Sequence, residues 1–249
     1  GICASDIPRA FDAMAYKYPL ILGHEFVGKI IKVGNKVNKF EKNDIVSAFP
    51  LIPCFTEKNS SKLCEYCMQN KFNLCNDYNY YGSRTDGSFS EILDVHEWNL
   101  FSVSKKNSLE TSCVLEPTAV AFNIFENLNL KSYDKKKILV LGGGFIGQIL
   151  LRILKEHSKR NEVHLADRNS FKLSLAKKCI NNSVLFSKKN KDYNHLIKKT
   201  LNNKFDIVVE TSGSSENFLN VLDFVKKDGK IVYSGNIDKD LVLKKYQVS

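Results

Sequence analysis

The feature that most constrains the fold is a glycine-rich turn between a predicted strand and a predicted helix in the second half of the chain. Residues 137–141 are a short, mostly apolar run, and residues 145–157 repeat apolar positions with helical spacing. The segment Gly142–Gly147 lies between them and matches the pattern G-x-G-x-x-G. A turn of this kind in this setting is typical of a doubly wound parallel sheet that binds a dinucleotide.

Each position of this turn has a physical role in that interpretation. Gly142 permits the tight turn, Gly144 lets the backbone approach a pyrophosphate, and Gly147 lets the helix pack against the strand. The helix starts at Phe145 and Ile146, where free N–H groups and the positive end of the helix dipole favour phosphate. The alternative is a doubly wound domain whose glycine turn binds no cofactor.

An acidic residue follows the next predicted strand. The strand over 163–166 ends beside Asp167, which comes 20 residues after Gly147, where the ribose-binding acid is expected. A carboxylate there accepts hydrogen bonds from the ribose hydroxyls and repels a 2′-phosphate, so it favours NAD over NADP. Arg168 comes next and could stack on adenine or hold a 2′-phosphate, so NADP remains open.

The rest of the second half alternates between strand and helix patterns. We predict helices over 118–127, 170–179, 193–201 and 215–225, and strands over 184–186, 205–209 and 230–234. Alternation at this spacing indicates a parallel sheet covered on both faces. We therefore expect a Rossmann-type domain over residues 118–249.

The first half has a different pattern. Short apolar runs between turn residues predict strands over 21–22, 26–33, 44–49 and 89–95, and so a mostly β domain over residues 1–117. Residues 55–80 are polar and lack periodicity, which indicates a long loop. A loop of this length in a compact domain needs something to hold it together.

Cysteines supply a candidate for that role. Four of the seven lie in one lobe over about 54–75, and no secretory signal is visible, so we expect a reducing, cytoplasmic setting and metal ligation rather than disulfides. The spacing Cys64-x-x-Cys67 lets two thiolates reach one tetrahedral ion. With Cys54 and Cys75 it predicts a closed structural zinc site that stabilises the lobe. The alternative is four unligated cysteines.

A second set of ligand types is spread along the first half. Cys3 lies near the start of the chain, the pair His24-Glu25 follows about 20 residues later, and Glu116 comes near the predicted domain boundary. A cysteine, a histidine and a carboxylate suit a catalytic zinc that keeps one position open. Because these residues are far apart in sequence, residue type alone leaves a purely structural role open.

The distribution of charge limits the kinds of partner that we expect. The net charge is +10, but the lysines are spread over every segment, and no Lys/Arg stripe alternates with aromatic residues. We therefore expect a small-molecule substrate, with a weak attraction for a phosphorylated one, and no nucleic-acid interface. No apolar run approaches the roughly 18–20 residues that a membrane span needs.

Several motifs together resemble the zinc-dependent medium-chain dehydrogenase/reductase superfamily. They are residues 2–6, 18–26, the four cysteines of the lobe, 86–91 and Glu116-Pro117. The resemblance extends to the polyol dehydrogenase branch, and residues 5–9, 50–55 and 82–87 are similar to its galactitol-1-phosphate 5-dehydrogenases. It implies a GroES-like, mostly β catalytic domain followed by a Rossmann domain.

The resemblance also assigns roles. It implies a catalytic zinc on Cys3, His24 and Glu116, with Glu25 as an exchangeable ligand, besides the structural zinc. The implied reaction transfers a hydride from a secondary alcohol of a polyol, or of a polyol phosphate, to NAD. Full-length members are commonly homo-oligomers.

Three further residues have suggested roles. Ser5 would pass the hydroxyl proton toward the cofactor, and Asp6 would orient His24; the alternatives are a turn-capping hydroxyl and a loop-closing acceptor. Arg84 is a candidate for holding a substrate phosphate, since its planar fork suits bidentate contact, although it also suits a plain surface position.

The chain departs from the superfamily pattern in four ways. Ala4 replaces a usual glycine, Pro8 stands where many alcohol dehydrogenases have a proton-relay histidine, and Cys54 precedes Cys64 by more than the usual two residues. Both ends are expected to fall short of the family. Two alternatives therefore stay open: a sorbitol, butanediol or threonine type of dehydrogenase, and a non-catalytic remnant that binds dinucleotide or zinc.

Overall fold

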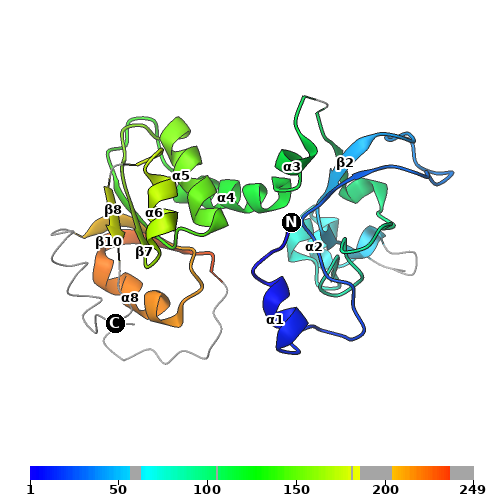
Figure 1. Ribbon diagram of the computed structural model, residues 1–249, viewed down its shortest axis with the longest axis horizontal. Helices are drawn as coiled ribbons and strands as arrows, with labels where there is room; N and C mark the ends of the chain where they lie inside the picture. The colour runs from blue at the N-terminus through cyan, green and yellow to red at the C-terminus, as the bar shows by residue number, and fades with distance from the viewer. Residues whose placement is uncertain (57–62, 105, 181, 186–203, 236–249) are drawn as a thin grey trace. The chain divides into compact units, whose positions relative to one another are not determined.

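The computed structural model describes residues 1–56, 63–104, 106–180, 182–185 and 204–235. The chain divides into two compact units, Gly1–Pro117 and Thr118–Ser249 (Figure 1). The helix predicted over 193–201 lies outside the described residues. In the described part of the chain, none of the helices has the length and apolar character needed to cross a bilayer.

The first unit contains two small antiparallel sheets. One has the order β1-β2-β5, and the other pairs β3 with β4. Its central strand β2 is well buried, with Val46 paired to Ser102 on one side and Ser47 to Val27 on the other. The strands are β1 (Val27–Lys29), β2 (Ile45–Ala48), β3 (Leu51–Ile52), β4 (Asn79–Tyr80) and β5 (Leu100–Ser102).

Short helical turns precede, connect and follow these strands. They are α1 (Asp6–Phe11), η1 (Cys54–Thr56), α2 (Glu65–Met68), η2 (Phe72–Leu74), η3 (Glu97–Asn99) and α3 (Leu109–Ser112). Three of them, η1, α2 and η2, lie in the cysteine-bearing lobe. The described residues of the long loop predicted over 55–80 therefore contain only short turns and β4.

The prediction of strands over 21–22 and 89–95 is wrong, because these residues form no strand. Residues 21–22 instead form irregular hydrogen bonds with the segment around Gly87: the Gly87 N–H donates to the Ile21 carbonyl at 2.8 Å. Glycines meet here backbone to backbone, since a Cβ built at Gly87 would lie 2.1 Å from the Gly23 carbonyl oxygen. This close approach, with Gly23 at φ 98°, replaces a regular strand ladder just before His24.

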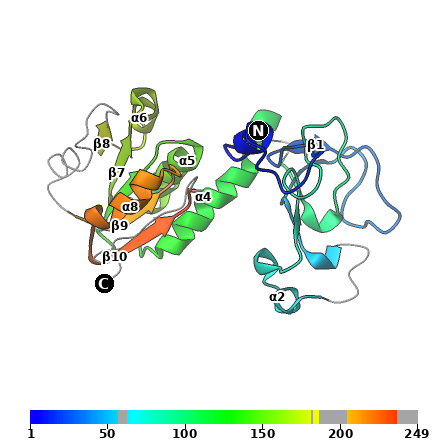
Figure 2. The same ribbon diagram turned by 90° about the horizontal axis from the view of Figure 1, so that it is seen from below.

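The second unit is a five-stranded parallel sheet of order β10-β9-β6-β7-β8 (Figure 2). Its strands are β6 (Lys137–Leu141), β7 (Glu162–Asp167), β8 (Asn182–Leu185), β9 (Phe205–Glu210) and β10 (Val225–Tyr233). Its helices are α4 (Leu115–Leu128, which begins before the unit boundary), α5 (Phe145–His157), α6 (Ser170–Ala176) and α8 (Ser215–Phe224). The predicted Rossmann-type architecture is confirmed.

Side chains of the central strand β6 alternate between two cores. Ile138 and Val140 join the core formed with α4, α5 and α6, whereas Leu139 and Leu141 join the core formed with α8. All four are fully buried, as expected for a parallel strand covered by helices on both faces. This packing holds the carboxyl end of β6, and so the glycine turn, in place.

Candidate functional site

The four cysteines of the lobe come together in space. Their Sγ atoms all lie within 4.8 Å of one another, and Cys64 Sγ is 3.8 Å from Cys75 Sγ. Cys54 begins η1, Cys64 caps α2, Cys67 lies within α2, and Cys75 follows η2 as its C-cap. The structure therefore includes Cys54 in the cluster, although its spacing departs from the family pattern.

The chemistry of this cluster suits a tetrahedral zinc. The backbone N–H of Cys67 stabilises the Cys64 thiolate and lowers the pKa of Cys64 to about 6. Burial raises the pKa of Cys67, and the neighbouring cysteines raise it further. A bound cation would offset the repulsion between such closely spaced thiolates, and four thiolates form a closed structural zinc site.

Aromatic rings also pack in this part of the unit. The Phe55 ring is centred 5.0 Å from the Phe72 ring, and the Trp98 ring lies 5.1 and 5.3 Å from these two. Trp98 is the single tryptophan of the chain. Its indole is therefore a natural reporter of the state of this lobe.

The second candidate centre is built around His24. Ligand atoms of Cys3, His24 and Glu25 all lie within 4.8 Å of one another. The side chains of His24 and Glu25 are buried, and Cys3 is half-buried. Burial raises the pKa of the Cys3 thiol, and the nearby carboxylates of Glu25 and Asp6 raise it further.

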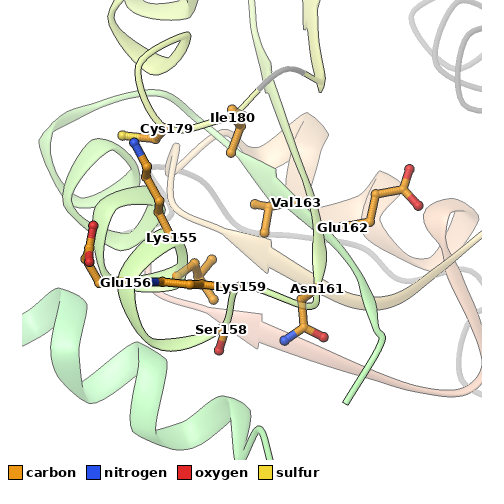
Figure 3. Close-up of a pocket in the computed structure, with 10 residues that line it drawn as sticks. Lys155, Glu156, Ser158, Lys159, Asn161, Glu162, Val163, Cys179 and Ile180 are labelled. Carbon is orange, nitrogen blue, oxygen red and sulfur yellow. The ribbon is translucent and has the colours of Figure 1, made fainter. Parts of the chain in front are cut away.

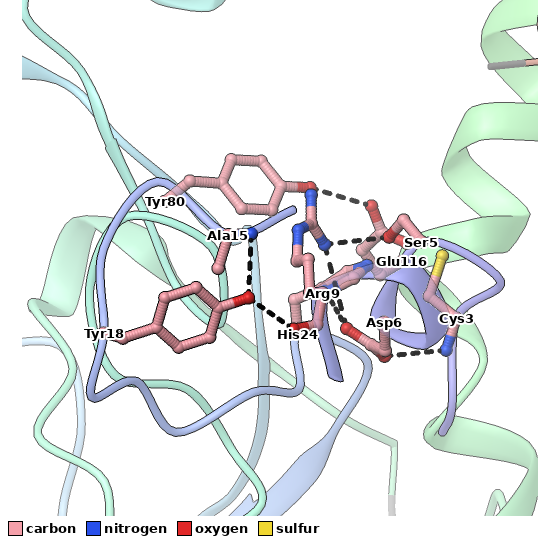
Figure 4. Close-up of polar contacts among 9 residues, drawn as sticks. All are labelled: Cys3, Ser5, Asp6, Arg9, Ala15, Tyr18, His24, Tyr80 and Glu116. Carbon is pink, nitrogen blue, oxygen red and sulfur yellow. Dashed lines mark hydrogen bonds and ion pairs between the residues drawn. The ribbon is translucent and has the colours of Figure 1, made fainter. Parts of the chain in front are cut away.

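Asp6 links two members of this centre (Figure 4). Its Oδ2 accepts a hydrogen bond from the Cys3 backbone N–H at 3.0 Å, and its Oδ1 lies 3.6 Å from His24 Nδ1. Asp6 is almost fully buried as the first residue of α1. A buried carboxylate facing one imidazole nitrogen leaves the other nitrogen for a metal.

Glu116 lies beside this set rather than within it. The Tyr80 hydroxyl donates to Glu116 Oε1 at 3.4 Å, and the Tyr80 ring meets the His24 ring edge-on at 5.7 Å between centroids. Burial raises the pKa of Glu116, with an opposing contribution from His24 and a further increase from Glu25. The three ionisable groups therefore share one electrostatic environment.

Sequence reasoning missed Arg9 and Tyr80. Arg9 Nη1 donates to Ser5 Oγ at 2.9 Å and lies 3.8 Å from Asp6 Oδ1 (Figure 4). Its spacing of three and four residues from Asp6 and Ser5 is a helical contact pattern, so α1 could have identified it. Tyr80 had no such signal, because it reaches Glu116 and His24 only through the fold.

Arg84 is held between two tyrosines. Its guanidinium carbon lies 4.3 Å from the ring centroids of both Tyr16 and Tyr78, and its Nη2 donates to the Tyr78 hydroxyl at 3.3 Å. Among the described residues, no carboxylate forms an ion pair with it, and its buried Nε has no hydrogen-bond partner. The stacking fixes the orientation of a cation that keeps donors available.

The glycine turn has the shape that a pyrophosphate site requires. Gly142 has φ 103°, and a Cβ at Gly147 would lie 2.1 Å from the Gly142 carbonyl oxygen. At Gly144, which caps α5, a Cβ would meet no atom of the described residues within 4 Å beyond its own chain neighbours. The open space is therefore at the position where phosphate would approach.

Asp167 lies at the end of β7 beside this turn. Its Oδ2 accepts from the Gly143 N–H and its Oδ1 from the Asn169 N–H, each at 2.7 Å. The carboxylate thus braces the glycine turn in addition to any contact with a ribose. Arg168 is exposed.

A separate cavity of about 380 Å³ lies at the other end of β7 (Figure 3). Its lining includes Glu162 and Val163 at the start of β7, Lys155 and Lys159 at the end of α5, and Cys179. Ligands of open parallel sheets bind beyond the carboxyl ends of the strands. Because this cavity adjoins the amino end, it is not the dinucleotide site.

Comparison with known proteins agrees with this geometry. Residues 1–105 match the alcohol dehydrogenase GroES-like domain, and residues 146–248 match the zinc-binding dehydrogenase family. The chain belongs to the zinc-dependent medium-chain dehydrogenase/reductase superfamily, so the predicted resemblance is confirmed.

Individual relatives are more distant. Galactitol 1-phosphate 5-dehydrogenase of Escherichia coli K12 is 34% identical over 177 residues, covering 71% of this chain and 48% of that protein. L-threonine 3-dehydrogenase of Yersinia pestis (strain Pestoides F) is 28% identical, covering 100% of this chain and 71% of that protein. The match to the first of these relatives spans about half of that protein's length.

A solved structure shows the same fold. The crystal structure of galactitol-1-phosphate dehydrogenase from Escherichia coli aligns with a TM-score of 0.83 at 28% identity. The alignment covers 100% of this chain and 69% of that one.

Proposed function

We propose that this protein oxidises a secondary alcohol of a polyol or polyol phosphate and transfers the hydride to NAD. The observation that carries the proposal is the meeting of Cys3, His24 and Glu25 within 4.8 Å, with Asp6 in contact with both Cys3 and His24. Family membership supports the same chemistry.

The residues fit two zinc ions. The four cysteines of the lobe would hold a structural ion. Cys3, His24 and Glu116 would hold a catalytic one, as the family resemblance implies, and Glu25, whose carboxylate lies within 4.8 Å of the Cys3 and His24 ligand atoms, would be the exchangeable ligand. A zinc at the second centre supplies Lewis acidity that lowers the pKa of the substrate hydroxyl. The buried, shared environment of both carboxylates is consistent with this exchange.

The protein's own groups prepare the proton transfer. Asp6 would orient His24, since its Oδ1 lies 3.6 Å from His24 Nδ1 and neither atom has a hydrogen-bond partner among the described residues. Nε2 of His24 would then be the nitrogen that binds the metal. Arg9 donates to Ser5 Oγ and so fixes the position of the hydroxyl that would accept the substrate proton. Ser5 keeps its own hydrogen for donation, since a hydroxyl both accepts and donates.

The glycine turn supports a nicotinamide dinucleotide as the hydride acceptor. The open space at Gly144 would receive the pyrophosphate, beside the N–H groups of Phe145 and Ile146 at the start of α5. Asp167 at the end of β7 favours NAD, because a carboxylate there repels a 2′-phosphate.

Arg84 supports a phosphorylated substrate. A guanidinium stacked on two rings, with no carboxylate partner among the described residues, suits bidentate binding of a phosphate. The similarity to a galactitol 1-phosphate 5-dehydrogenase points to the same substrate class.

The test is a screen for NADH formation across polyols and polyol phosphates, with zinc content measured on the same sample. The Arg84→Ala variant should raise KM for the phosphorylated polyol at least tenfold and leave KM for the free polyol nearly unchanged. Arg160→Ala removes an exposed arginine as the charge-matched control. Equal losses on both substrates would remove the phosphate role from Arg84.

The alternatives give different results in the same screen. A threonine type of dehydrogenase, favoured by the match of this whole chain to 71% of an L-threonine 3-dehydrogenase, would oxidise threonine faster than any polyol. Sorbitol and butanediol types would prefer those unphosphorylated substrates. A non-catalytic remnant would form no NADH and would lack the second zinc.

A further inference from the structure

Glu210 is a buried acid that neither metal centre uses. It ends β9, the strand beside β6, and its side chain is 0% exposed. An ionised carboxylate is costly to bury unless hydrogen bonds satisfy it. Its partners therefore indicate what it holds in place.

Among the described residues, the hydrogen-bond donors to the Glu210 carboxylate lie in residues 211–214, which we call the β9 loop. Glu210 Oε1 accepts from the Ser212 N–H at 2.8 Å and also from the Ser212 hydroxyl, and Oε2 accepts from the Gly213 N–H at 3.3 Å. Ser212 Oγ in turn accepts from Asn217 Nδ2 at 2.8 Å and from the Ser214 N–H at 3.2 Å. One carboxylate thus anchors the whole loop.

The β9 loop packs directly against the glycine turn. Thr211 Oγ1 donates to the Gly142 carbonyl at 2.9 Å and lies 3.1 Å from the Leu141 carbonyl. A Cβ at Gly142 would lie 2.8 Å from the Ser212 backbone nitrogen, and a Cβ at Gly147 would lie 3.2 Å from Thr211 Oγ1. Loop and turn therefore form one surface at the carboxyl ends of β9 and β6, the edge where open parallel sheets bind ligands.

We propose that Glu210 is a positioning residue for the dinucleotide, acting through the β9 loop. This inference rests on the proposed function, because it concerns the same cofactor site. A loop made of serine, threonine and glycine buries little apolar surface of its own, so without an anchor it would lose conformational entropy on binding. Because the Glu210 hydrogen bonds order the loop during folding, the loss of conformational entropy does not occur when the cofactor binds.

The direct test is Glu210→Gln with NADH as the probe. The amide nitrogen of glutamine would face N–H and O–H donors, so at least one loop hydrogen bond is lost. We expect the Kd for NADH to rise about tenfold. Zinc content should stay at the wild-type value, because the residues of both candidate metal centres belong to the first unit and the β9 loop belongs to the second.

Asp206→Asn is the matched control. Asp206 lies near the other end of β9 and accepts from the Lys137 N–H at 2.7 Å and from Lys226 Nζ at 2.9 Å. We expect this variant to be less stable to urea and to bind NADH like the wild type. Stability loss alone would then not explain weaker binding in Glu210→Gln.

Ser212→Ala provides a second test in case Glu210→Gln does not fold. It keeps the carboxylate and removes one of its donors, so the Kd for NADH should rise by about two- to threefold. Amide hydrogen exchange in the peptide containing residues 211–214 should be faster than in the wild type without NADH and similar at saturation.

Two results would overturn the inference. One is wild-type NADH affinity in both Glu210→Gln and Ser212→Ala, and the other is an equal loss of affinity in Asp206→Asn at equal loss of stability. If the wild type itself binds no NADH, the proposed function fails first and this inference fails with it, so the two failures are distinguishable.

Discussion

Two glycines of the same turn should respond in opposite ways to the same added methyl group. Gly144 and Gly147 are three residues apart, and each is a glycine of the G-x-G-x-x-G motif. A Cβ at Gly147 would lie 2.1 Å from the backbone oxygen of Gly142, whereas a Cβ at Gly144 faces open space. We therefore predict that Gly147→Ala damages the fold and that Gly144→Ala damages only dinucleotide binding.

The magnitudes follow from these contacts. At Gly147, overpacking against backbone costs about 1–3 kcal/mol, and the better helix propensity of alanine returns only about 1 kcal/mol. At Gly144, which has φ −67°, the smaller entropy of the unfolded chain stabilises alanine by about 0.4–1 kcal/mol. Loss of the glycine cap offsets this by a similar amount, so the free energy of unfolding should change by less than about 0.5 kcal/mol.

The assay pairs urea unfolding, followed by far-ultraviolet circular dichroism, with NADH titration. Gly144→Ala should keep the wild-type unfolding midpoint and lose at least about tenfold in NADH affinity, because its methyl occupies the space for the pyrophosphate. Gly147→Ala should unfold at lower urea and bind NADH more weakly as well. Wild-type NADH affinity in a folded Gly144→Ala protein would refute the assignment of the turn.

Three further predictions concern the remaining sites. Cys67→Ser should release the structural zinc, lower Tm and shift the Trp98 emission to longer wavelength, since Trp98 packs on Phe55 and Phe72; unchanged emission after zinc loss would contradict this. Burial alone would raise the pKa of Asp206, but hydrogen bonds from Lys137 and Lys226 lower it overall. The Asp206 carboxylate therefore stabilises the folded protein above its ordinary pKa of about 3.9, and this stabilisation is lost as pH falls through the lower pKa of the folded state. Asp206→Asn should therefore flatten the acid limb of the stability–pH curve, and an unchanged limb would count against those bonds. Asp6→Asn should lower kcat more than about tenfold while NADH affinity stays constant, and a selective effect on NADH affinity would argue against its contact with His24.

The second unit was largely predictable because its signals are local. The strand over 137–141 and the helix over 145–157 match β6 and α5 residue for residue, since an apolar run, a glycine turn and a helical repeat follow one another directly. The start of β10 was predicted less well. Its strand begins at Val225, where we expected the last residue of a helix.

The first unit was harder to predict because tertiary contacts shape it. Backbone contacts between Gly23, Gly82 and Gly87 override the strand pattern of residues 21–22 and 89–95, and no local signal marks such contacts. The cysteine lobe was predictable from spacing, and the structure brings its four thiols together.

The candidate site was predictable in part. Cys3, His24 and Glu25 were identified by residue type and family resemblance, and the structure brings their ligand atoms together, whereas Glu116, the predicted third ligand, lies outside that cluster. Tyr80 and Glu210 act through partners that only the fold brings near, at Glu116 and in the β9 loop. Contacts between residues so far apart in the chain produce no periodic pattern or motif in the sequence.

Zinc content, measured on purified wild-type, His24→Ala and Cys67→Ser protein, decides whether the chain has two metal centres. We predict two zinc ions per wild-type chain. In His24→Ala, only the ion on the four cysteines should remain, with Trp98 emission unchanged. One zinc or none in the wild type, with no further loss in folded His24→Ala, would contradict a metal centre at Cys3, His24 and the neighbouring carboxylates.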